Sequence, residues 1–258
     1  MRLRRACDDV RVSQVPAATR ALRILRFLAS QPGPVPAERI ARAVGMPRSS
    51  AYHLLNAMIG EGFVVHVADD QGFGLGLAAF EVGTGFARQE PLQRVARRPL
   101  AELSTQLRQT AHLAVMHGRD VLYVIEQRYP GRPTLVTDVG VRLPAHLTAS
   151  GRAILASLPK SQLRALFPDR ASFVNRTGAG PRSLTALHSV LAESRSRGYA
   201  VEDGEVSPDR TSVAVAVHDH NRHPIAAVAV TYAGPVDEPY LVDRVAATAA
   251  ELTRRIGG

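Results

Sequence analysis

One short segment of the chain separates polar from apolar side chains. Residues 48–62, with the sequence RSSAYHLLNAMIGEG, place Ala51, Leu54, Leu55 and Met58 at the spacing of one helix face. The opposite face carries cationic, hydroxyl, imidazole and amide groups, from Arg48, Ser49, Ser50, Tyr52, His53 and Asn56. Groups of these kinds bind base edges and phosphates in a major groove. We therefore predict that the six polar residues form a DNA-binding surface.

Two helices are predicted immediately before this segment. Residues 17–30 carry an apolar stripe at helical spacing, formed by Ala21, Leu22, Leu25 and Leu28. Residues 36–45 predict a shorter helix that begins at Pro36 and ends at Gly45, where glycine permits a tight turn. Two helices joined by such a turn, the second with a polar outer face, are typical of a helix-turn-helix.

A hairpin is predicted after the polar helix. Residues 63–67 and 73–76 predict two strands that are joined by a turn at residues 69–72. Three helices and a hairpin in this order predict a winged helix-turn-helix domain over residues 1–77. The glycines between residues 72 and 76 do not favour a phosphate-binding loop, because the segment has no lysine and we expect no helix to open directly after it.

Positive charge is concentrated at the N-terminal end of the chain. The 258 residues carry a formal net charge of +9, and residues 1–60 hold ten arginines against three acidic residues. This asymmetry favours a polyanionic partner, either nucleic acid or a membrane surface. Lys160 is the one lysine, and the preference for arginine suits bidentate phosphate contacts, although it equally fits a GC-rich genome.

Other features of the composition exclude several classes of protein. No apolar run reaches the roughly eighteen residues of a membrane helix, and the first residues lack the apolar stretch of a signal peptide. The absence of tryptophan and the low aromatic content count against a membrane-surface protein. Cys7 is the only cysteine, so neither an intrachain disulfide nor a cysteine-based zinc site is expected. We expect a cytoplasmic protein with no membrane partner and no cofactor.

The remainder of the chain predicts a helical linker and a second domain. The linker, residues 78–94, opens a helical stretch that breaks near Pro91 and reaches Leu107 through a second proline, Pro99. Beyond it we expect an α+β domain over residues 95–258, in which helices flank a central antiparallel sheet. Its predicted elements are two strands within residues 111–127, helices at 148–158 and 183–197, strands at 213–217 and 225–230, and a helix at 242–256.

Some residues of this second domain have side chains that suit other chemistry. Thr148 and the small residues after it predict a capped helix whose free backbone N–H groups bind carboxylates. His218, His220 and His223 are of the type that binds zinc, but we favour a solvated hairpin turn. The acidic stretch 202–205 suits acid–base catalysis, yet the chain has no nucleophile elbow, metalloprotease, P-loop or dinucleotide motif.

Taken in order, these segments resemble one family, the isocitrate lyase regulator (IclR) family of bacterial transcription factors. The likeness runs from RALRILRFLAS and GPVPAERIARAVGMPRSSAYHLLNAMIGEGFV through RLPAHLTASGRAILASLP, RGYAVEDGE and SVAVAVHDHNRHPIAAVAV. It covers nearly the whole chain. The resemblance implies a GAF-like effector-binding domain behind the winged helix, a dimer on DNA, and often a tetramer.

The resemblance also implies which residues contact an effector. In the family these contacts come from the helix start after a PxHxTA-like stretch, from the acidic stretch and from the last two strands. Carried over to this chain, they are Ala149, Ser150, Glu202, Ser212, Ala229 and Thr231. The chain departs from the common family pattern at six positions. It has His53 in place of a basic residue, Glu202 in place of Asp, Gly204 in place of Glu, Asp209 in place of Gly, Ser212 in place of Cys, and Ala229 in place of a polar residue.

Two hypotheses about function follow. The first is a sequence-specific transcriptional regulator, not an enzyme, that binds double-stranded operator DNA and responds to a small-molecule effector, expected to be an organic acid. The sign of regulation, the operator, and the choice between dimer and tetramer are left open. The alternative is an enzyme or carrier that binds a small carboxylic acid and uses its N-terminal module only for assembly.

Overall fold

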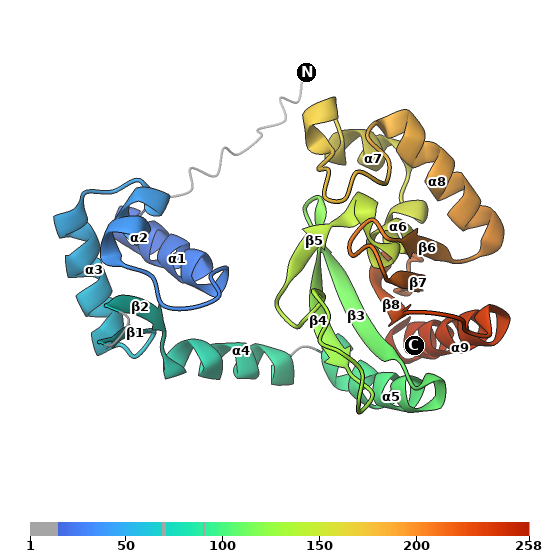
Figure 1. Ribbon diagram of the computed structural model, residues 1–258, viewed down its shortest axis with the longest axis horizontal. Coiled ribbons are helices and arrows are strands. Elements are labelled where there is room, and N and C mark those ends of the chain that lie inside the picture. Colours follow the sequence, from blue (N-terminus) through green and yellow to red (C-terminus); the bar gives the residue numbers. More distant parts are fainter. Residues whose placement is uncertain (1–14, 69–70, 90, 258) are drawn as a thin grey trace, which may run out of the picture. The chain divides into compact units, whose positions relative to one another are not determined.

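The computed structural model describes residues 15–68, 71–89 and 91–257, and the chain divides into two compact units, Met1–Gln89 and Glu90–Gly258 (Figure 1). The first unit includes α4 (Leu77–Gln89), which lies in the predicted linker. Within the described residues, no helix is both long and apolar enough to cross a membrane.

The first unit is a helix-turn-helix followed by a hairpin. It contains α1 (Pro16–Ala29), α2 (Ala37–Val44), α3 (Arg48–Gly60), and the antiparallel strands β1 (Val64–Val67) and β2 (Gly72–Leu75). The predicted order of three helices and a hairpin is confirmed. The turn between α2 and α3 depends on a glycine, since the residue after α2 has a φ of 68°, which side chains disfavour.

The core of the first unit differs in one respect from the predicted stripe. Ile24 and Leu28 of α1 are buried against Leu55 of α3 and Phe73 of β2, whereas Leu22 is 63% exposed. Residues two apart on a helix point in nearly opposite directions, so Leu22 and Ile24 cannot share the buried face. The prediction that Leu22 belongs to the stripe was therefore wrong.

The second unit is an α+β domain around one antiparallel sheet, as predicted. Its sheet has the strand order β5-β4-β3-β8-β7-β6, and every neighbouring pair is antiparallel. The elements are α5 (Pro91–Leu107), β3 (Thr110–His117), β4 (Asp120–Gln127), β5 (Arg142–Pro144), η1 (Ala145–Leu147), α6 (Ala149–Ala156), α7 (Lys160–Leu166), η2 (Arg170–Ser172), α8 (Leu184–Arg197), β6 (Ala200–Asp203), β7 (Thr211–His218), β8 (Pro224–Tyr232) and α9 (Glu238–Gly257).

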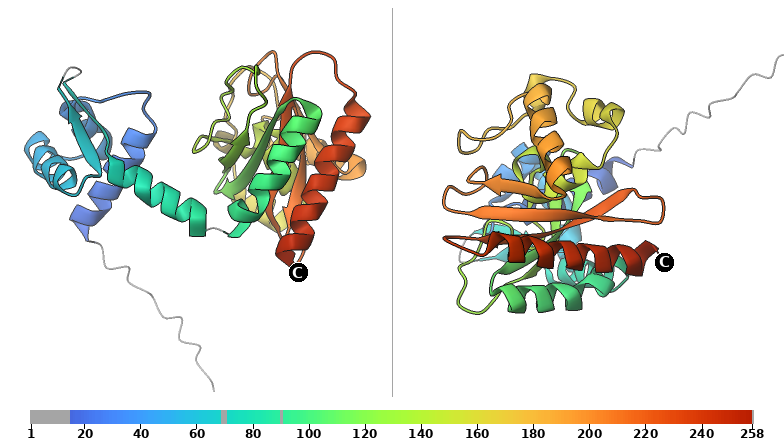
Figure 2. Two further views of the ribbon diagram at one scale, coloured as in Figure 1. Left: turned by 90° about the horizontal axis from the view of Figure 1, so that it is seen from below. Right: turned by 90° about the vertical axis from the view of Figure 1, so that its right-hand side faces the viewer.

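The two faces of this sheet carry side chains of different size. Large side chains, such as Val213, Val217 and Val228, pack against α5 and α9. The other face carries four alanines, which are Ala200, Ala214, Ala227 and Ala229. Because these side chains are small, α6 packs closely against this alanine-paved face. Figure 2 shows α5 and α9 on one side of the sheet and α7 and α8 on the other. The alternation of valine and alanine along β7 and β8 therefore specifies a sheet that is covered on both faces.

Candidate DNA-binding and ligand-binding sites

The polar face of α3 is open to solvent. Ala51, Leu55 and Met58 point into the core, and five of the six predicted DNA-binding residues are exposed. The exposed residues are Arg48, Ser49, Tyr52, His53 and Asn56, and the sixth, Ser50, is half-buried. The structure thus presents hydrogen-bonding side chains to solvent on one helix face, with Arg48 donating to the Tyr52 hydroxyl at 3.5 Å. Such a face is the arrangement that entry into a major groove requires.

Ring contacts connect this face to the hairpin. The Arg48 guanidinium lies over the Tyr52 ring, 5.7 Å from its centroid. The Tyr52 ring meets Phe73 of β2 edge-on at 6.2 Å, and Phe73 in turn contacts the His66 ring at 4.8 Å. The orientation of Tyr52 is therefore held by a buried ring. His66 is an exposed imidazole beside this row that sequence reasoning did not single out, because it lies on the same strand face as the buried Val64 and alternation does not mark it as exposed.

The outer face of α1 carries three cations. Arg20, Arg23 and Arg26 are exposed, and none of them has an ion-pair partner among the residues that the structure describes. In contrast, Arg42 of α2 pairs with Glu38 at 3.2 Å. The arginines of α1 are therefore available for contacts with phosphates.

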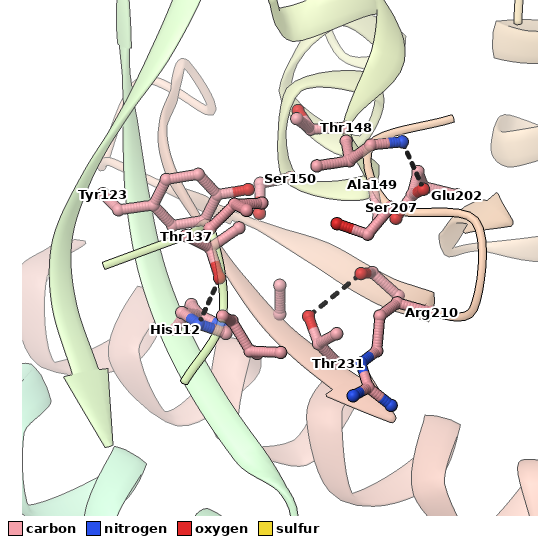
Figure 3. A pocket seen from close by; sticks show the side chains of 15 residues that line it. His112, Tyr123, Thr137, Thr148, Ala149, Ser150, Glu202, Ser207, Arg210 and Thr231 are labelled. Atoms are coloured by element: carbon pink, nitrogen blue, oxygen red, sulfur yellow. Dashed lines mark hydrogen bonds between the residues drawn. The ribbon is translucent and has the colours of Figure 1, made fainter. Parts of the chain in front are cut away.

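All six residues that the family resemblance assigned to an effector line one cavity, which we call the inner cavity (Figure 3). It lies in the second unit between α6 and the end of the alanine-paved sheet face, and it holds about 400 Å³ of empty space counted out to its mouth. Its further lining residues are His112, Tyr123, Leu135, Val136, Thr137, Thr148, Val206, Ser207 and Arg210.

Strand register explains why residues distant in sequence meet here. Glu202 of β6 pairs with Ser212 of β7, and Ser212 pairs with Thr231 of β8, so the three lie in one row across the sheet. Two residues before Thr231 on β8, Ala229 pairs with His112 of β3 and belongs to a second row. Because side chains alternate between faces, both rows point to the same side of the sheet, beneath α6.

The N-terminus of α6 presents donors to the inner cavity. Thr148 caps the helix, as predicted, by accepting a hydrogen bond from the Gly151 N–H at 3.0 Å. Among the described residues, the N–H groups of Ala149 and Ser150 have no acceptor. The Ser150 side chain is 1% exposed and its hydroxyl makes no hydrogen bond of good geometry, although Tyr123 lies near enough to interact with it. Such a group of buried donors can bind an anion.

Glu202 forms an acidic wall of the same cavity. It is 2% exposed, and its carboxylate accepts a hydrogen bond from the Val206 N–H at 2.9 Å. Burial raises the pKa of Glu202, and the hydrogen bonds from Val206 and Ser212 oppose that rise. The Ser212 and Thr231 hydroxyls are 3.0 Å apart and hydrogen-bond each other. The cavity therefore combines anion-binding donors at one end with an acceptor and two hydroxyls at the other.

Two buried aromatic side chains of the cavity were missed from the sequence. His112 Nε2 lies 2.9 Å from the Thr137 hydroxyl, and burial together with the nearby positive charge of Arg128 lowers the pKa of His112 to about 3. Burial likewise raises the pKa of Tyr123. Both side chains are therefore neutral at physiological pH and act as hydrogen-bonding groups. The missing signals were the register of β3 with β8 for His112 and the register of β3 with β4 for Tyr123, which a single sequence does not contain.

A buried ion pair lies behind the α6 N-terminus. Arg152 of α6 reaches Glu205 at 2.6 Å and also donates to the carbonyl oxygens of His146 at 3.0 Å and Val201 at 2.7 Å. The Arg152 side chain is only 4% exposed. It therefore ties α6, η1 and β6 to the loop that carries Val206.

Other candidate sites from the sequence are not assembled. His218 contacts Ser157, His220 contacts Asn221, and Asp219 accepts from the backbone N–H groups of the turn. Within the part of the chain that the structure describes, no three metal-binding side chains come together. His146 is buried between aromatic rings, with Nε2 at 3.0 Å from the Val174 carbonyl oxygen, as expected of a structural residue.

Comparison with known proteins identifies both units. Residues 17–68 match the model of the IclR helix-turn-helix domain, and residues 85–254 match the model described as "Bacterial transcriptional regulator IclR C-terminal". The chain belongs to the IclR family. The family resemblance inferred from the sequence motifs is thereby confirmed, as are the helix-turn-helix and the GAF-like α+β domain.

Relatives of known role place the chain among transcriptional regulators. It is 30% identical to the glycerol operon regulatory protein of Streptomyces coelicolor, over 92% of this chain and 95% of that protein. It is 29% identical to the transcriptional repressor IclR of Escherichia coli, over 86% of this chain and 81% of the relative. These relatives are named as regulators of transcription and not as enzymes, so the enzyme alternative has no support.

A solved structure has the same fold. An IclR homologue from Microbacterium hydrocarbonoxydans, solved in complex with 4-hydroxybenzoate, superposes with a TM-score of 0.78. The two chains are 21% identical, and the match covers 92% of this chain and 98% of that one.

Proposed function

We propose that this IclR-family regulator recognises an operator through α3 and that a small organic acid in the inner cavity changes its affinity for DNA. For the DNA contacts we assign base and phosphate binding to Arg48, Ser49, Ser50, Tyr52, His53 and Asn56. We further propose that a dimer, or a tetramer built from dimers, places two copies of α3 in successive major grooves of a pseudo-palindrome.

One observation carries the ligand half of the proposal. The Ser150 hydroxyl is buried and lies at a helix N-terminus. Within the residues that the structure describes, it has no hydrogen bond of good geometry, and the two N–H groups beside it have no acceptor. Unsatisfied donors inside a protein are costly, and a carboxylate is the ligand that satisfies several of them together. We therefore assign the ligand carboxylate to Ala149 and Ser150.

The opposite end of the cavity suits a ligand hydroxyl. Glu202 repels a bare anion, so a ligand hydroxyl, a proton or a water must lie between Glu202 and the acid. Ser212 and Thr231 add hydroxyls beside it, and Ala229 leaves space for the ligand body. The relative bound to 4-hydroxybenzoate supports this class, since that ligand combines one carboxylate with one hydroxyl.

The DNA half is tested by binding to the duplex immediately upstream of the protein's own gene, with a scrambled duplex as control. We expect specific binding to be tighter by on the order of a thousandfold, with affinity that falls steeply as salt rises. Equal weak binding to both duplexes would contradict an operator at that place. No binding even at low salt would contradict DNA binding by α3.

Base reading is separated from phosphate binding by paired variants. Tyr52→Phe keeps the ring that packs on Phe73 and removes only the hydroxyl, and His53→Ala removes an exposed imidazole. We expect both to weaken operator binding more than binding to the scrambled duplex. Arg23→Ala is the matched control, and it should weaken both equally and reduce the salt dependence. Equal losses on both duplexes for Tyr52→Phe and His53→Ala would contradict the base-reading assignment.

The ligand half is tested by calorimetric titration with 4-hydroxybenzoate and a panel of short carboxylic acids. We expect at least one acid to bind and to change the affinity for the operator. Ser150→Ala should weaken that binding by on the order of tenfold and leave DNA binding without ligand unchanged. Ser189→Ala makes the same change on the exposed side of α8 and should have no effect. Equal binding by wild type and Ser150→Ala would contradict the assignment of the carboxylate.

A further inference from the structure

A second cavity adjoins the inner one. Its empty space, with the open solvent at its mouth included, is about 240 Å³, and we call it the outer cavity. The two cavities share Leu135, Arg210 and Thr231 in their linings, and the outer cavity is also lined by Thr110 and Arg132. Arg132 and Arg210 therefore border a space that adjoins the inner cavity at Thr231.

Tight turns fix the backbone of both arginines. The Arg210 N–H donates to the Ser207 carbonyl oxygen at 3.0 Å, and the Arg210 carbonyl oxygen accepts from the Gly204 N–H at 3.0 Å. The Arg132 N–H donates to the Tyr129 carbonyl oxygen at 3.1 Å, in a turn where Gly131 has a φ of 83°. Both side chains consequently start from anchored positions at the mouth of the ligand site.

In the described part of the chain, the two guanidinium groups have no acidic partner. Both residues are half-buried, yet within residues 15–68, 71–89 and 91–257 neither forms an ion pair. Arg132 donates one hydrogen bond to the Arg108 carbonyl oxygen at 2.8 Å. No hydrogen bond from any residue that the structure describes engages the Arg210 side chain. In the same unit, Arg128 and Arg152 are each paired with a glutamate, so a shortage of acidic residues is not the reason.

The position of Arg210 separates it from the acidic wall. Figure 3 shows its guanidinium on the side of Thr231 and away from Glu202. A half-buried cation with free planar donors favours an anion that accepts two hydrogen bonds, as a carboxylate does. The α6 N-terminus, which we assigned to the ligand carboxylate, lies in the inner cavity, so the arginines mark a separate place for negative charge.

We infer that the outer cavity is a second anion subsite and that the ligand of this regulator is a dianion, such as a short dicarboxylic acid. One carboxylate binds at Ala149 and Ser150, and the other binds between Arg132 and Arg210. The inference rests on the proposed function, because it needs the first carboxylate in the inner cavity. It goes beyond that function by making charge at the far end of the ligand the determinant of specificity.

Matched acids of equal chain length test the inference on the full-length protein. Titration calorimetry compares succinate with butyrate, glutarate with valerate, and adipate with hexanoate, at constant ionic strength. We expect at least one dicarboxylate to bind on the order of tenfold more tightly than its partner. Arg210→Gln should bring the two affinities close together, because it weakens binding of the dicarboxylate more than binding of the monocarboxylate. Arg132→Gln should reduce the preference in the same direction.

Control variants keep the outcomes distinct. Arg164→Gln removes the same charge from an exposed position on α7, and the preference should persist in it. The melting temperature of each variant without ligand shows that it is folded. Equal affinity of the wild type for both members of every pair would overturn the second subsite and leave an organic-acid effector standing. A preference that survives in Arg210→Gln would overturn the role of Arg210. If no acid of either class binds, the proposed effector fails, and the second subsite fails with it.

Discussion

Replacing Arg152 with methionine should destabilise the second unit severely. Methionine keeps most of the apolar stem but removes every donor. It leaves the Glu205 carboxylate, whose side chain is 12% exposed, without its cation, and the His146 and Val201 carbonyl oxygens without a donor. Breaking a buried ion pair from one side costs about 3–5 kcal/mol. For a domain of roughly 150–250 residues this corresponds to a fall in melting temperature of about 6–20 °C.

The assay is urea unfolding followed by far-ultraviolet circular dichroism, since the chain has no tryptophan. Glu205→Gln keeps an acceptor for Arg152 and should cost less than Arg152→Met. In the double variant no buried charge is left alone. Its loss should therefore be smaller than the sum of the single losses, by about 0.5–3 kcal/mol. A loss below about 1 kcal/mol for Arg152→Met, or additive losses in the cycle, would refute the importance of this pair.

Three further predictions concern residues near the inner cavity. A Cβ on Gly151 would clash with the Ala145 carbonyl oxygen, so Gly151→Ala should lower the melting temperature and abolish acid binding. At Gly198 the added Cβ would meet open space, and Gly198→Ala should lower the free energy of unfolding by only about 1 kcal/mol. Equal shifts in melting temperature for the two variants would contradict this reasoning. Burial raises the pKa of Glu202, so ionising this side chain opposes folding. The melting temperature of Glu202→Gln should therefore rise relative to that of the wild type as pH increases above about 4.3. A difference in melting temperature that is constant with pH would be evidence against a raised pKa. Burial lowers the pKa of His112 to about 3, so the unfolded chain takes up the proton at a higher pH than the folded chain, and the free energy of unfolding falls as pH drops below about 6.5. His112→Gln should lessen that fall between pH 7 and 5. An unchanged dependence on pH would count against a buried neutral histidine.

Local signals in the sequence were sufficient for most elements. Thr148 and Ser183 accept hydrogen bonds at the starts of their helices, and Gly198 ends α8 in the left-handed conformation. Caps of this kind depend on one or two residues, so a single sequence reveals them. The alternation of valine with alanine likewise identified β7 and β8, because it reflects a period of two.

Features that depend on pairing between distant strands were not predictable in this way. The strands β5 and β6 are three and four residues long and lie at the two edges of the sheet, where no periodicity can develop. His112 enters the cavity only because β3 pairs with β8 in one register. Arg152 resembles a surface cation of a short helix in the sequence, and only the approach of the loop at Glu205 makes it a buried partner.

The loop between β6 and β7 is the part of the cavity that a ligand should order most. Its Val206 N–H binds the Glu202 carboxylate, its Gly204 N–H binds the Arg210 carbonyl oxygen, and its Glu205 side chain binds Arg152. An acid that reaches Glu202 through a hydroxyl or a water and binds Arg210 through a carboxylate adds bonds at both ends of this loop. A ligand shifts an equilibrium only by the difference between its affinities for the two arrangements. The acid must therefore bind more tightly when the loop is closed than when it is open, so the closed arrangement gains stability.

Hydrogen exchange at the backbone can detect that gain. We expect the amides of Gly204, Val206 and Arg210 to exchange on the order of tenfold more slowly when the acid is bound, because each opening of the loop then breaks ligand contacts as well. The amides of α9, on the opposite face of the sheet, provide an internal reference that should change little. Protection confined to the first turn of α6 would mean that the acid is held by the helix alone. In that case the β6–β7 loop would not transmit its binding.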